Sequence, residues 1–171
     1  MEIEEVIKIA GVLKNIAVFE YLTPEELEQV INKAELVWFK KGKVILEQGK
    51  TCRTFHLIIK GKVSVWVYRK FCSKVLIAYL GKDEYFGEMS LVFDDAITNT
   101  ILAEEDIEAF KLTRRNLKLL YAENPVIQQK MEKVKAEWSP ENDVLTVSND
   151  LKTVYQKCWL WHRFKLFIGL S

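Results

Sequence analysis

The stretch FHLIIKGKVSVWVY, residues 55–68, decides the fold class of this chain. Its second half alternates between a face of valines and a face of polar and aromatic side chains: Val63, Val65 and Val67 against Ser64, Trp66 and Tyr68. A period of two residues with β-branched and aromatic side chains predicts a strand with one buried face. Gly61 separates this strand from the apolar run before it and lies between two lysines, as expected for a tight, solvent-exposed turn.

Short runs rich in Val, Ile, Phe, Tyr and Trp continue on both sides of this stretch. They are ELVWFKK (35–41), VILEQG (44–49), KVLIAYLG (74–81) and TNTILAEEDIEAFKL (98–112). Several of them end at a glycine, at roughly the spacing of 8–12 residues that is typical of antiparallel strands. The pattern predicts a sandwich, roll or barrel over residues 36–112, and not parallel βαβ units.

Helices are predicted before these strands. Apolar residues recur at steps of three and four from Val6 to Ile16, which is typical of an amphipathic helix. A second helix begins at Pro24, because Thr23 can cap it and Glu26 completes a capping box.

Helices are also predicted after the strands. Thr113 begins one, with Leu117 and Leu120 facing inward, and Pro125 begins another with Asn124 as its cap. We therefore expect four parts: N-terminal helices (1–35), a β core (36–112), C-terminal helices (113–138) and a tail whose structure the pattern does not fix (139–171).

The composition excludes several broad classes of function. Hydrophobic residues make up 49% of the 171 residues, which is ample for a core and excludes wholesale disorder. A net charge of +1 argues against a general nucleic-acid-binding domain. The three cysteines and two histidines lack the spacing of a zinc site, and so few cysteines fit a reducing compartment. With acidic residues at the N-terminus and no apolar run of roughly 18–20 residues, we expect a soluble cytoplasmic protein.

The sequence contains no motif of a catalytic site. His56 alternates within a strand and lies beside no glycine-flanked nucleophile, so we interpret it as a strand histidine with satisfied hydrogen bonds. Asp94 and Asp95 lack the spacing of a calcium loop and are typical of a polar loop tip. We therefore predict that the chain is not an enzyme and needs no metal or cofactor.

The segment YFGEMSL, residues 85–91, is the candidate binding site. A glycine follows the end of a strand here, and the apolar run after it is too short for a full helix. Such a turn can present the backbone N–H groups from Gly87 to Ser90 to an anion, while Glu88 can accept hydrogen bonds from hydroxyl groups. A plain strand-to-helix turn with Glu88 in solvent fits the same residues equally well.

Several motifs in the same order resemble the cyclic nucleotide-binding domain family of bacterial transcription regulators, cyclic-nucleotide-dependent kinases and gated channels. The resemblance covers about residues 15–135, and its clearest segments are residues 15–49, FHLIIKGKVSVW (55–66), FGEMSL (86–91) and LTRRNLKLLYAENP (112–125). It implies a mainly β fold: an eight-stranded antiparallel β-roll, jelly-roll-like, with helices at both ends. It also implies a phosphate-binding cassette between the sixth and seventh strands.

The resemblance further implies a ligand, cyclic AMP or cyclic GMP, and the residues that contact it. Glu88 matches the family's glutamate, which holds the ribose 2′-hydroxyl. The backbone amides from Gly87 to Ser90 match those that approach the cyclic phosphate. Together with the position that follows the cassette, the candidate ligand-binding residues are Phe86, Gly87, Glu88, Met89, Ser90, Ile97 and Thr98.

The chain departs from the family pattern at the arginine that pairs with the phosphate. Counting without a gap places Ile97 at this position, with Thr98 after it, and no basic residue lies between Lys82 and Lys111. An apolar side chain facing a phosphate leaves the anion poorly paired. The substitution therefore predicts weakened or altered ligand binding.

Three functional interpretations follow: a regulatory sensor that binds a cyclic nucleotide, a degenerate scaffold for protein interaction or dimerisation, and a DNA-binding regulator. The residues after 139 show no helix-turn-helix pattern, so we expect no DNA binding by this chain. The helix over 126–138 can pair with its counterpart in a homodimer, and a regulated partner protein is the alternative. The aromatic, basic tail (158–170) can lie at a membrane interface, but packing on the domain or a second copy is favoured.

Overall fold

The computed structural model describes residues 3–68, 74–93 and 97–137. The expectations for the tail (139–171), including membrane contact by residues 158–170, fall outside this part of the chain, and the division into four parts stays a prediction. Among the described residues, no helix combines the length and the hydropathy that crossing a membrane requires.

Helices and strands follow one another in the order that the sequence predicts. The helical segments are α1 (Ile3–Leu13), the 3₁₀ turn η1 (Ala17–Phe19), α2 (Pro24–Asn32), α3 (Met89–Val92), α4 (Arg114–Glu123) and α5 (Pro125–Glu137). The strands are β1 (Glu35–Phe39), β2 (Val44–Leu46), β3 (Thr54–Lys60), β4 (Val63–Tyr68), β5 (Lys74–Leu80), β6 (Tyr85–Phe86), β7 (Thr100–Ala103) and β8 (Ile107–Thr113).

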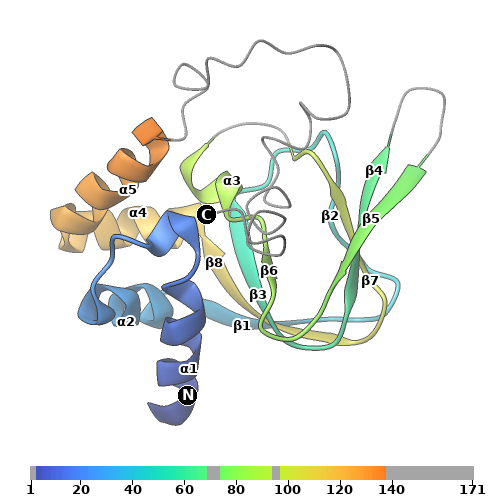
Figure 1. The fold of residues 1–171 in the computed structure, drawn as a ribbon, viewed down its shortest axis with the longest axis horizontal. Coiled ribbons are helices and arrows are strands. Elements are labelled where there is room, and N and C mark those ends of the chain that lie inside the picture. The colour runs from blue at the N-terminus through green and yellow to red at the C-terminus, as the bar shows by residue number, and fades with distance from the viewer. Residues whose placement is uncertain (1–2, 69–73, 94–96, 138–171) are drawn as a thin grey trace, which may run out of the picture. The chain divides into compact units, whose positions relative to one another are not determined.

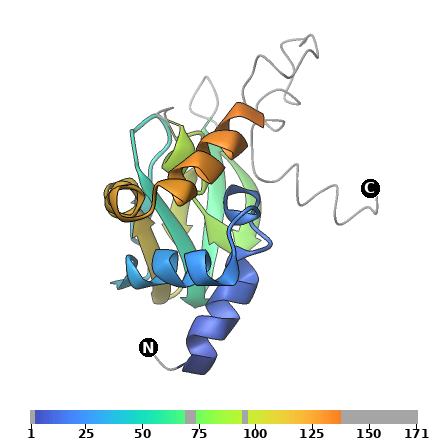
Figure 2. The ribbon, with the colours of Figure 1, turned by 90° about the vertical axis from the view of Figure 1, so that its left-hand side faces the viewer.

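The strands form two antiparallel sheets of four strands, in the orders β1-β8-β3-β6 and β2-β7-β4-β5 (Figure 1). The two sheets face each other as the walls of a roll, and the helices lie outside the wall that contains β3 and β8 (Figures 1 and 2). The predicted eight-stranded antiparallel roll with flanking helices is confirmed. Its strands extend from Glu35 to Thr113, one residue beyond the expected range at each end.

Strand β4 shows how the alternation is realised. The valine face is buried as expected, and Tyr68 on the other face is exposed. Ser64 departs from the pattern, because it is also fully buried. Its hydroxyl donates to the Glu104 carboxylate at 2.5 Å and accepts from the Trp66 indole N–H at 2.7 Å, so both of its polar roles are satisfied.

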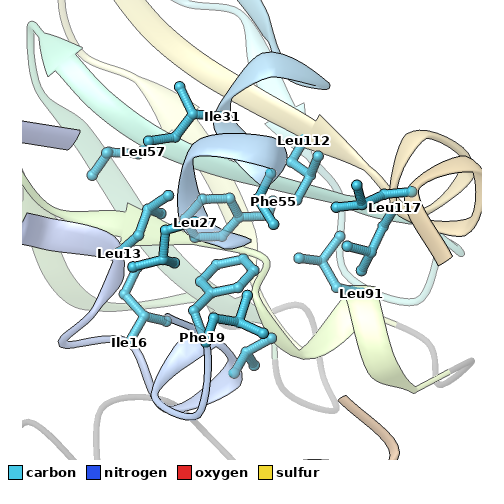
Figure 3. Close-up of a cluster of buried hydrophobic side chains, with 14 of the residues drawn as sticks. Leu13, Ile16, Phe19, Leu27, Ile31, Phe55, Leu57, Leu91, Leu112 and Leu117 are labelled. Carbon is cyan, nitrogen blue, oxygen red and sulfur yellow. The ribbon is translucent and has the colours of Figure 1, made fainter. Parts of the chain in front are cut away.

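Strands β3 and β8 are buried on both faces. Their outward side chains join the buried residues of the helices in one cluster, which includes Phe55, Leu57, Leu91, Leu112 and Leu117 (Figure 3). Their inward side chains, among them His56, Ile58, Ile107 and Ala109, are buried inside the roll. The wall formed by β3 and β8 therefore separates two apolar compartments.

The predicted helix caps are confirmed. The Glu26 N–H donates to the Thr23 hydroxyl at 3.3 Å, and the Thr23 N–H donates to the Glu26 carboxylate at 2.8 Å. The Asn116 N–H donates to Thr113 at the start of α4. At the start of α5, the Val126 N–H donates to the side chain of Asn124, as the sequence predicts.

The turn at Gly61 differs from the expectation of a solvent-exposed position. Gly61 has φ of +93° and is half-buried. A Cβ atom at this position would lie 2.4 Å from the carbonyl oxygen of Asp106. The turn thus requires glycine for two reasons, its backbone conformation and the close approach of the loop before β8.

Replacing Thr23 by Ala should lower the free energy of unfolding by about 0.5–2 kcal/mol, because the α2 cap loses its acceptor. Chemical denaturation measures this change. Thr51→Ala, at an exposed loop threonine, is the control and should change stability by less than about 0.5 kcal/mol. Equal stabilities for the two variants would mean that the cap does not hold α2.

Candidate functional site

The predicted cassette lies between β6 and β7, where a tight turn leads into the four-residue helix α3. Gly87 begins this turn with φ of +84°. A Cβ atom at Gly87 would lie 2.4 Å from the carbonyl oxygen of Thr54, the first residue of β3. Only glycine lets the turn approach β3 this closely, so the glycine fixes the position of the segment that follows it.

Backbone and hydroxyl contacts hold the turn in place. The Ser90 hydroxyl lies 3.0 Å from the carbonyl oxygen of Thr54 and 2.6 Å from that of Gly87. The N–H groups of Ser90 and Leu91 donate to the carbonyl oxygens of Gly87 and Glu88. Within the described residues, the N–H groups of Gly87 and Met89 donate to no backbone carbonyl outside regular helices and strands, so they are available to a ligand acceptor.

Glu88 is buried, with 3% of its surface exposed, so the alternative of a plain turn with this side chain in solvent is wrong. Burial raises the pKa of its carboxyl group to about 7, and a hydrogen bond from its own backbone N–H opposes this rise only in part. A buried carboxyl with so high a pKa lacks a strong positive partner. Hydroxyl donors of a ligand would stabilise its ionised form.

His56 lies next to the cassette, since it pairs with Phe86 across β3 and β6. Its ring stacks on that of Phe86 at a centroid distance of 4.9 Å and meets the edge of Phe39 at 5.8 Å. Its Nδ1 atom is buried without a hydrogen-bond partner in the described structure, so the expectation of a fully satisfied histidine is wrong. Burial, with a smaller contribution from the charge of Lys111, lowers the pKa of His56 to about 3, so the ring is neutral.

The far end of α3 is held by Arg114, the first residue of α4. The Arg114 side chain is buried; its Nε donates to the carbonyl oxygen of Leu91 at 2.9 Å, and its Nη2 donates to that of Phe93. Leu91 itself belongs to the buried cluster of the helices (Figure 3). This role could not be predicted from the sequence, because position 114 stands out only as the residue after a helix cap.

The remaining predicted site residues, Ile97 and Thr98, lie just before β7. Ile97 is half-buried, and its backbone pairs with the loop between β2 and β3. The Gly49 N–H donates to the Ile97 carbonyl oxygen at 2.8 Å, and the Ile97 N–H donates to that of Lys50 at 2.9 Å. Thr98 is exposed. The structure thus gathers residues 86–90 in one turn and ties Ile97 to the loop after β2.

Comparisons with known proteins agree with this architecture. The model of the cyclic nucleotide-binding domain matches residues 36–124. A human cGMP-dependent protein kinase 2 is 34% identical over 95 residues, which are 55% of this chain and 12% of the kinase. The cyclic AMP receptor protein of Thermus thermophilus is 27% identical over 132 residues, which are 77% of this chain and 61% of that protein. The chain therefore spans only a small part of the kinases that it matches.

A solved structure shows the same fold. The N-terminal domain of a transcriptional regulator from Streptomyces coelicolor superposes with a TM-score of 0.67. The superposition covers 82% of this chain and 99% of that domain, at 20% sequence identity. At this identity the likeness concerns the fold alone.

Gly87→Ala should destabilise the domain by about 2–5 kcal/mol. The alanine would have to adopt a left-handed backbone conformation, and its Cβ atom would also clash with β3. Gly42→Ala is the matched control: its φ of +81° is similar, but no atom lies within 4 Å of the added Cβ. This control should cost only about 1–2 kcal/mol. Thermal or chemical unfolding compares the stability of the two variants. Equal losses of stability would contradict the close approach of the turn to β3.

Glu88→Gln should raise the free energy of unfolding at pH 8 by about 3 kcal/mol, since it removes an ionised group that burial destabilises. The folded pKa is about 7 and the unfolded value is near 4.5, so wild-type stability falls as the pH rises between these values. The difference between variant and wild type should therefore disappear below pH 4.5. His56 titrates in both proteins, so the difference between them isolates Glu88. A difference that does not vary with pH would contradict the raised pKa.

Proposed function

Because the chain belongs to the cyclic nucleotide-binding domain family, we propose that it is a regulatory domain that senses a cyclic nucleotide at the cassette of residues 86–90. The observation that carries this proposal is the pairing of two features in one turn. Within the described residues, the backbone N–H groups of Gly87 and Met89 donate to no backbone carbonyl outside regular helices and strands, and Glu88, whose side chain is buried, lies between them in the chain. A cyclic nucleotide carries a phosphate for the first feature and a ribose hydroxyl for the second.

The predicted residues of the turn, 86–90, each have a role in this proposal. Glu88 accepts a hydrogen bond from the ribose 2′-hydroxyl, and the cyclic phosphate binds at the turn from Gly87 to Ser90. The N–H groups of Gly87 and Met89 donate to it, since the Ser90 N–H is bonded to the carbonyl oxygen of Gly87. Ser90 also holds the turn against Thr54. Phe86 is buried against His56 and supports the turn from the side of the sheet.

Ile97 makes this binding weaker than in a domain with an arginine at the same position. A charge-assisted hydrogen bond contributes about 1.5–3 kcal/mol, and loss of one member of a buried charge pair costs about 2–5 kcal/mol. At about 1.4 kcal/mol per factor of ten, the affinity falls by roughly ten- to several-thousand-fold. The domain then responds only to high ligand concentrations or through additional contacts.

The output of the domain is proposed to be a regulated partner protein, and the chain itself is proposed to have no catalytic activity. A homodimer through α5 is less favoured, because Ile127 and Met131 on its apolar face are already buried in the cluster of this domain. A degenerate scaffold that binds no nucleotide remains the alternative. The proposed location is the cytoplasm, where cyclic nucleotides act as messengers.

Ile97→Arg tests the proposal. Calorimetric titration with cyclic AMP and cyclic GMP should show weak binding by the wild-type chain and binding at least about tenfold tighter by the variant. Glu88→Ala in the Ile97→Arg background should weaken binding again, because the hydroxyl acceptor is lost.

Ile7→Arg is the control for added charge, because Ile7 is 66% exposed on α1. It should leave binding unchanged. Submicromolar binding by the wild-type chain would contradict the predicted weakening. Absence of binding by both the wild type and Ile97→Arg would instead favour the scaffold.

A further inference from the structure

The cassette carries no positive charge of its own. No basic residue occurs between Lys82 and Lys111, while Glu88 lies in the centre of the turn. An anionic ligand at this turn therefore needs a cation from another segment of the chain. Among the described residues, the segments that contact the cassette are the best candidates to supply it.

The loop between β2 and β3, residues 47–53, is tied to the cassette region at both of its ends. On one side, Gly49 and Lys50 form the two backbone hydrogen bonds to Ile97. On the other side, the carbonyl oxygen of Thr54 contacts the Ser90 hydroxyl and packs against Gly87. The loop therefore runs along the cassette from the position of the missing arginine to the turn.

Lys50 is the cation of this loop that is best placed for a ligand at the cassette. Its backbone is hydrogen-bonded to Ile97, so its Cα lies beside the position from which the family's arginine extends. Its side chain is 67% exposed and forms an ion pair with Glu47 at 2.7 Å. Exposed ion pairs of this kind are weak, so Lys50 can exchange Glu47 for a phosphate at little cost.

Two cations on β8 and α4, Lys111 and Arg114, are already used. Arg114 donates to two carbonyl oxygens at the end of α3, where it holds the helix. Lys111 is paired with Glu35 at 3.4 Å on the β1 side of the sheet. Both side chains have structural partners that a ligand would have to displace.

We propose that Lys50 pairs with the phosphate of a cyclic nucleotide bound at Gly87–Ser90, in place of the arginine that Ile97 replaces. This inference rests on the proposed function and assigns its phosphate contact to the loop between β2 and β3. In this arrangement the phosphate replaces Glu47 as the partner of Lys50. Since Lys50 is exposed, its contribution is screened by salt more strongly than that of a buried arginine.

Calorimetric titration of Lys50→Ala with cyclic AMP and cyclic GMP tests the assignment. At low salt, the variant should bind about three- to tenfold more weakly than the wild type, and Lys50→Arg should bind as well as the wild type. The wild-type affinity should fall with added salt, and the affinity of Lys50→Ala should fall less.

Lys40→Ala is the matched control, because Lys40 is also an exposed lysine in an ion pair, with Asp106 at 2.7 Å. It precedes β2, whereas Lys50 follows β2, and its loss should not change binding. In the Ile97→Arg background, Lys50→Ala should lower the affinity by less than about twofold, since the arginine then pairs with the phosphate.

Equal affinities for Lys50→Ala, Lys40→Ala and the wild type would overturn the inference. A loss of affinity in Arg53→Ala that Lys50→Ala does not show would overturn it as well. Either result leaves the proposed function intact, provided that the wild type or Ile97→Arg binds a nucleotide. Absence of binding by both of these proteins would overturn the proposed function together with the inference.

Discussion

Strands β3 and β8 must bury both of their faces, and the rest of the domain depends on this constraint. Phe55 and Leu112 pack outward under the helices, while His56 and Ala109 face into the roll. A shift of the pairing by one residue would exchange the two faces and place His56 in the helical cluster. The register of these two strands is therefore fixed from both sides. β3 also pairs with β6, with His56 opposite Phe86, and this pairing brings the carbonyl oxygen of Thr54 close to Gly87.

The same wall couples the cassette to the helices. Leu91 of α3 is buried in the cluster that α1, α2, α4 and α5 share with the outer face of β3 (Figure 3). Arg114 at the start of α4 binds the carbonyl oxygens at the end of α3. A displacement of α3 would therefore break polar contacts to α4 and disturb apolar packing at the same time. Under the proposed function, a ligand that moves the turn at Gly87 would change the energy of the flanking helices through these contacts.

Features with local causes could be predicted from the sequence, and features that depend on distant contacts could not. The alternation in β4 and the capping box at Thr23 each arise within a few residues, so the pattern reveals them. The burial of Glu88 depends on how the roll closes around the turn, so the sequence could not decide between a buried and a solvent-exposed side chain. The unpartnered Nδ1 of His56 was missed for the same reason, since its neighbours Phe39 and Phe86 come from other strands.

In the proposed site, Ile97 in place of an arginine would affect Glu88 as well as the phosphate. Burial already raises the pKa of Glu88 to about 7. A bound phosphate adds a negative charge close to this carboxyl group and raises its pKa further, unless a cation offsets that charge. A protonated Glu88 is a poorer acceptor for a hydroxyl group, so under the proposed function Ile97 would weaken both polar contacts of the ligand. An exposed cation such as Lys50 offsets this effect only in part, because solvent and salt screen it more than a buried arginine.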